Sequence, residues 1–217
     1  MSSIRAAHPI ADASLTVAKP VRDFGGRPPS TRPAPVVSNG RLALVLFMMT
    51  ETMLFAGLMG TFVVFRVSSR QWPPVGQPYL PIAVTWVNSA ILLASAWTMH
   101  AAVRAVRRGA LSQFRVDLLV TLALGSTFLA VQGFEWTRLI AHGLTLASSN
   151  YGATFYSLIG LHALHVIGAV VWLAVVAVGA RRSRYTALRY TGVELCGMYW
   201  YYVCGLWVIL FTLVYLK

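Results

Sequence analysis

The sequence predicts an all-α integral membrane protein, a bundle of five transmembrane helices that follows a disordered N-terminal tail. Two observations support this prediction. Five apolar segments each exceed the roughly 20 residues that cross the hydrocarbon core of a bilayer. The chain is also 57% hydrophobic and only 11% charged, with a mean hydropathy of +0.65. Such a composition excludes a water-soluble globular domain.

The predicted tail covers residues 1–40, which precede the first apolar segment. It is rich in proline, arginine, serine and glycine, and it contains no apolar run. A segment of this kind buries too little apolar surface to offset the entropy of ordering, so we expect it to be disordered. It also lacks the apolar core of a secretory signal peptide, so we expect the N-terminus to stay in the cytoplasm.

Basic residues bound the first two apolar segments. The first predicted span, residues 42–65, lies between Arg41 and Arg66. The second, residues 82–103, follows a proline-containing loop and stops before Arg104. Because a guanidinium is costly in hydrocarbon but readily reaches the headgroups, these arginines mark where each helix leaves the bilayer.

The remaining three spans cover residues 118–140, 153–180 and 193–216. None of the five spans alternates apolar and polar residues in segments of about 10, so the sequence does not fit a transmembrane β-barrel. Together with their loops the spans form one predicted transmembrane domain, residues 41–217.

The basic residues predict the orientation of the bundle. Of the 18 Lys and Arg residues, 14 lie in the tail and in the second and fourth loops, whereas four lie on the other side. The positive-inside rule therefore places the N-terminus in the cytoplasm and the C-terminus outside. The same rule accounts for the formal charge of +12 without a nucleic-acid partner.

Glu51 is the first candidate site residue, because a carboxyl inside a membrane span is costly and is usually functional or paired. It follows Arg41 by about ten residues, or roughly 15 Å of helix, which places it near the midplane. His162 and His165 lie at a similar depth in the fourth span, three residues apart and on one helix face. We therefore expect Glu51 and this histidine pair to be able to meet as a proton network.

A purely structural interpretation of these residues stays open. Glu51 would then donate one hydrogen bond between helices, and the two histidines would be neutral packing residues. A metal or haem site is disfavoured, because a transition metal needs three or four ligands and only Glu51 is an obvious third.

Three further acidic residues fall in or beside the spans. Glu135 precedes Arg138 by three residues, which predicts an ion pair within one helix. Asp117 and Glu194 lie near cytoplasmic boundaries, where contact with water would satisfy them.

Seven motifs, in order and with matching spacing, give the transmembrane part a resemblance to subunit III of the haem-copper oxidases, in the short five-helix bacterial form. They are residues 49–57 (MTETMLFAG), 72–74 (WPP), 87–95 (VNSAILLAS), 132–136 (QGFEW), 151–156 (YGATFY), 160–168 (GLHALHVIG) and 199–200 (YW). The resemblance covers about residues 42–216.

This resemblance implies an accessory subunit in the bacterial inner membrane, with no haem, copper or catalytic residue of its own. It implies packing on the catalytic subunit I, whose haem and copper reduce oxygen, together with bound phospholipid and support of proton uptake. By position, Glu51 is similar to the family's membrane-buried reactive glutamate, and His162 and His165 match its two histidines. Glu135 and Glu194 match further family acids.

The sequence departs from the family pattern after Trp200. The family typically continues with His, Phe, Val and Asp, whereas this chain has Tyr201, Tyr202, Val203 and Cys204. A phenol and a thiol thus replace an imidazole and a carboxylate, so a proton role of Tyr201 and Cys204 does not carry over.

Two other functions compete with an oxidase subunit. A homologue attached to a nitric-oxide reductase or another respiratory complex would share the five-span core. A stand-alone transporter using Glu51 as an ion site is disfavoured, because transporters commonly have internal repeats and broken helices.

The charge asymmetry makes a direct prediction of topology. A reporter fused at residue 30 should stay cytoplasmic, and one fused after Lys217 should be external, because 14 of the 18 cations lie on the cytoplasmic side. Two reporters found on the same side of the membrane would contradict an odd number of spans.

Overall fold

The computed structural model describes residues 39–72, 74 and 82–216 of the chain. Five α-helices account for nearly all of this part, and the described residues contain no strand beyond a single bridge between Thr186 and Arg189. The helices are α1 (Asn39–Ser68), α2 (Ile82–Arg107), α3 (Leu111–Ala141), α4 (Asn150–Arg181) and α5 (Thr191–Tyr215). The tail predicted for residues 1–40 lies outside the described residues, apart from Asn39 and Gly40 in α1.

The predicted all-helical bundle of five membrane spans is confirmed. Each helix is long and apolar enough to cross a bilayer. The helices run past the predicted span limits, most clearly where α3 begins at Leu111 instead of residue 118. Hydropathy starts this predicted span just after Asp117, but the backbone hydrogen bonds of α3 already begin at Leu111. Within the added segment Arg115 is partnered, because it donates to the Ala180 carbonyl at 3.1 Å and to Ser183 Oγ at 3.1 Å.

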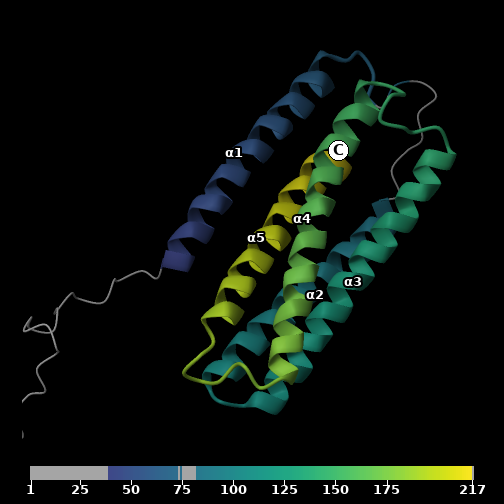
Figure 1. Cartoon of the computed structure of the whole chain (residues 1–217). Helices are drawn as coiled ribbons and strands as arrows, with labels where there is room; N and C mark the ends of the chain where they lie inside the picture. The colour runs from purple at the N-terminus through teal and green to yellow at the C-terminus, as the bar shows by residue number, and fades with distance from the viewer. Residues whose placement is uncertain (1–38, 73, 75–81, 217) are drawn as a thin grey trace, which may run out of the picture. The chain divides into compact units, whose positions relative to one another are not determined.

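Four helices form a closed ring, and the fifth packs outside it. Contacts join α2 to α3, α3 to α4, α4 to α5, and α5 back to α2, whereas α1 contacts only α4 and α5. Figure 1 shows α1 lying along one side of the bundle. Of its 30 residues only Leu44, Phe55 and Phe62 are buried.

Large aromatic rings of α5 fill the centre of the ring of four helices. Trp200 and Trp207 are each 1% exposed. Their indole N–H groups need acceptors, and two serines of α2 supply them. Trp200 donates to Ser95 Oγ at 3.1 Å, and Trp207 donates to Ser89 Oγ at 2.8 Å.

A glycine of α3 makes room for one of these rings. A Cβ placed on Gly125 would collide with the six-membered ring of Trp200. That ring cannot swing away without losing the hydrogen bond to Ser95. By contrast, a Cβ on Gly133 of the same helix would meet nothing within 4 Å.

We therefore predict that Gly125→Ala destabilises the bundle by about 1–3 kcal/mol, the usual cost of forcing extra volume into a packed core. Gly133→Ala is the matched control, and it should leave stability unchanged or slightly raised, because alanine favours the helix. Thermal unfolding of both variants in detergent measures the difference. Equal melting temperatures for the two variants would show that the Trp200 ring is not tightly held.

Candidate functional site

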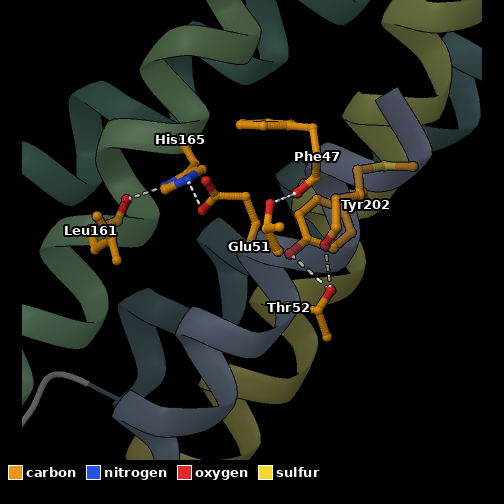
Figure 2. A network of polar contacts seen from close by, with 8 residues as sticks. Phe47, Glu51, Thr52, Leu161, His165 and Tyr202 are labelled. Atoms are coloured by element: carbon orange, nitrogen blue, oxygen red, sulfur yellow. Dashed lines mark hydrogen bonds and ion pairs between the residues drawn. The ribbon is translucent and has the colours of Figure 1, made fainter. Parts of the chain in front are cut away.

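The crossing of α1 and α4 holds an ionisable pair. Glu51 Oε2 of α1 lies 2.7 Å from His165 Nε2 of α4. Figure 2 shows the two side chains pointing toward each other from their separate helices. The Glu51 side chain is 17% exposed and the His165 side chain 11%, so the pair lies largely inside the protein but is not sealed.

The pair lies near the middle of both helices. Glu51 is the 13th of the 30 residues of α1, and His165 is at the centre of the 32 residues of α4. At the helical rise of 1.5 Å, Glu51 is only about 4 Å from the midpoint of α1. The depth predicted from the sequence therefore agrees with the position of this residue in the helix.

A second contact of His165 determines what its ring can do. His165 Nδ1 lies 2.7 Å from the Leu161 carbonyl oxygen, which can only accept, so Nδ1 carries a proton. Nε2 then has two options at its 2.7 Å contact with Glu51. Either a protonated Glu51 donates to a neutral ring, or a protonated ring donates to the carboxylate. In both cases one proton is shared between Glu51 and His165.

Aromatic residues and hydroxyls surround the pair. The Phe55 ring meets the His165 ring edge-on, with centroids 5.3 Å apart. Next to Glu51, the Thr52 hydroxyl contacts both the Met48 carbonyl oxygen at 2.7 Å and the Tyr202 hydroxyl at 3.2 Å. Tyr202 was not among the predicted site residues, because only the crossing of α1 and α5 brings its phenol beside Thr52.

His162 lies apart from this pair. It is 1% exposed and stacks on Trp207, with centroids 5.2 Å apart and planes 25° apart. Neither ring nitrogen has a hydrogen-bond partner among the described residues. Three residues along a helix still separate two side chains by about 60°, which turns His162 toward α5 while His165 faces α1. The structure thus brings Glu51 together with only one of the two predicted histidines.

Two of the three further acids, Glu135 and Glu194, are held by arginines near the membrane boundaries. The third, Asp117, was expected to be satisfied by water, but its Oδ2 is buried and has no hydrogen-bond partner among the described residues. Glu135 accepts from Arg138 at 3.2 Å, which confirms the predicted pair within α3. Glu194 in the first turn of α5 pairs with Arg41 of α1, at 2.6 Å, and with Arg107 of α2. We expected water to satisfy Glu194, but it joins three helices. A carboxylate at a helix N-terminus also complements the helix dipole.

Tyr201 and Cys204, which depart from the family pattern, lie away from Glu51. The buried Tyr201 hydroxyl has no partner among the described residues, and Cys204 Sγ lies 3.9 Å from the Leu92 carbonyl of α2. In the described part of the chain no three His, Cys, Asp or Glu residues gather as a metal would require. At the Glu51–His165 contact, both side chains belong to types that can hold and release a proton.

Comparison with known proteins gives one consistent result. The family described as cytochrome c oxidase subunit III matches residues 30–217. A protein named cytochrome c oxidase subunit 3 from Thermostichus vulcanus is 33% identical over 176 residues, which cover 81% of this chain and 86% of that protein. A second protein named cytochrome c oxidase subunit 3, from Synechocystis, is 34% identical over a region that covers 80% of this chain and 73% of that protein. A probable cytochrome c oxidase subunit 3 from Mycobacterium leprae is 33% identical over 79% of this chain and 84% of that protein.

The different settings of the two histidines predict opposite responses to the same substitution. His165→Phe leaves the Glu51 carboxyl without its partner, so we expect the free energy of unfolding to fall by about 1–3 kcal/mol. His162→Phe keeps a ring stacked on Trp207 and removes two unpartnered nitrogens, so we expect stability to be unchanged or raised. Melting temperatures of the two variants in detergent provide the measurement. If His162→Phe lowered the melting temperature as much as His165→Phe, the conclusion that only His165 holds a polar contact would be wrong.

Proposed function

The chain belongs to the cytochrome c oxidase subunit III family, and we propose that its Glu51–His165 pair supports the supply of protons to the catalytic subunit of the oxidase. As a member of this family it is an accessory subunit of a haem-copper oxidase. It is a multi-pass protein of the bacterial inner membrane. The proposal assigns it a role in turnover beyond assembly.

The observation that carries the proposal is the 2.7 Å contact between Glu51 Oε2 and His165 Nε2, near the middle of both helices. A carboxyl and an imidazole in hydrogen-bond contact suit proton transfer, because each of the two groups can hold a proton or give it up. Ionisable groups in a membrane interior are rare, and proton relays are one of the roles that they mark. Neither side chain is fully buried, so a proton can be exchanged with a neighbouring molecule.

The proposal leaves electron transfer to the partner subunits. Haem and copper, in this account, belong to the catalytic subunit I, on which this chain packs, and oxygen is reduced there. We further propose that the chain holds phospholipid. The apolar side chains of α1 support this, because 27 of its 30 residues are not buried in the described part of the chain. In a membrane such a surface is covered by acyl chains or by another subunit.

A plain structural role for the pair is the alternative that the experiment must separate. Glu51 and His165 do join α1 to α4, so any loss of function could follow from a loosened helix. Glu51→Gln separates the two roles. The amide still reaches His165 and can donate a hydrogen bond, but it cannot hold or release a proton.

We predict that an oxidase carrying Glu51→Gln assembles normally and begins turnover at nearly the wild-type rate. It should then pump fewer protons per electron or lose activity sooner, because the proton supply fails while electron transfer continues. Proton-to-electron ratio and activity lifetime of the intact complex provide the readouts.

Glu135→Gln is the matched control, since it removes a carboxylate whose partner is the exposed Arg138. It should leave both quantities unchanged. If Glu51→Gln also leaves both quantities unchanged, the pair is structural. If both variants shorten the lifetime equally, the effect comes from general stability, and the proposal fails.

A further inference from the structure

The outward face of α2 carries an unusual set of side chains. Trp97 is 77% exposed. It lies on the opposite side of the helix from Ser95 and Met99, which are buried in the bundle. His100 and Arg104, three and seven residues further on, are also exposed and belong to the same stripe.

With the midpoint of α2 taken as the midplane of the bilayer, two of these side chains fall within the hydrocarbon. The 26 residues of α2 extend over about 39 Å, and the midpoint of the helix falls between residues 94 and 95. Trp97 is then about 4 Å and His100 about 8 Å from the midplane, inside a half-thickness of roughly 15 Å. Arg104, about 14 Å from the midplane, reaches the boundary with the headgroups.

The usual explanation of membrane tryptophans accounts for Trp86 but not for Trp97. Tryptophan gathers at the membrane interfaces, where its ring is apolar and its N–H reaches water or headgroups. Trp86 lies about 13 Å from the midplane, which places it in that belt. Its ring also packs on Phe211, with centroids 4.7 Å apart. Trp97 lies far from the belt and makes no ring contact with the other described residues.

Lipid chains cannot satisfy the polar atoms of Trp97 and His100, which lie deeper in the bilayer than Arg104. Among the described residues, neither the indole N–H of Trp97 nor the imidazole of His100 has a hydrogen-bond partner, and Arg104 has no ion-pair partner. An unpartnered donor in hydrocarbon is costly, and polar side chains at this depth usually face protein. The pattern therefore indicates a protein neighbour instead of acyl chains.

We propose that Trp97, His100 and Arg104 form the surface by which this subunit docks on a transmembrane helix of another oxidase subunit. The face offers hydrogen-bond donors at two depths and a cation at its cytoplasmic end, and it carries no carboxylate. The complementary helix therefore presents acceptors opposite Trp97 and His100 and an acidic group opposite Arg104. This inference rests on the proposed association with the oxidase but not on the role of Glu51, so the two can fail separately.

Photo-crosslinking in the intact complex tests the docking face. A benzophenone amino acid replaces Trp97 in one variant and Leu164 in the other. Leu164 is the matched control, because it is 63% exposed and lies at the midpoint of α4. We expect position 97 to crosslink strongly to another oxidase subunit and position 164 to label mainly lipid. Crosslinks from position 97 only to lipid or to this chain, or equal crosslinking at both positions, would overturn the proposal.

Retention of the subunit gives a second readout that does not depend on the probe. His100→Leu should reduce the fraction of this chain that stays with the oxidase in detergent, because it removes a hydrogen bond across the docking face. Leu164→Ala should leave that fraction unchanged. Because the His100 side chain points out of the bundle, the isolated variant should keep its melting temperature. Full retention of the His100→Leu variant would contradict a contact there.

Discussion

The contact between Glu51 and His165 is the interaction on which the position of α1 depends. Helices in a bilayer gain no hydrophobic driving force from packing together, and α1 buries only three of its side chains. Polar contacts therefore hold it at three depths. Arg41 pairs with Glu194 at one end, Glu51 meets His165 in the middle, and Arg66 donates to the Leu213 carbonyl at 3.0 Å near the other end.

Hydrogen bonds within the protein also order the ring of four helices. A donor inside it can find an acceptor only within the protein, because hydrocarbon offers none. Serines at positions 89 and 95 accept from the two central tryptophans, so the aromatic filling of the core is oriented by hydrogen bonds as well as by shape. This ring gives α4 a fixed surface, and His165 is presented from that surface toward Glu51.

The sequence predicted the five spans because long apolar runs bounded by arginines have few alternatives in a membrane. It also predicted the depth of Glu51 and of both histidines, since depth depends only on distance along one helix. It could not separate His162 from His165, because that difference depends on where α1 and α5 pack around α4. For the same reason the contact of Tyr202 with Thr52 and the pairing of Glu194 with two arginines were missed.

The central claim is that the proton shared by Glu51 and His165 moves while the oxidase works. Infrared difference spectroscopy of the intact complex, comparing the resting state with steady turnover, tests this claim most directly. The account predicts a carboxyl band that changes on turnover, is absent in Glu51→Gln and is shifted in His165→Phe. Difference spectra that are identical in wild type and Glu51→Gln would contradict it, because the pair would then keep its proton throughout the reaction.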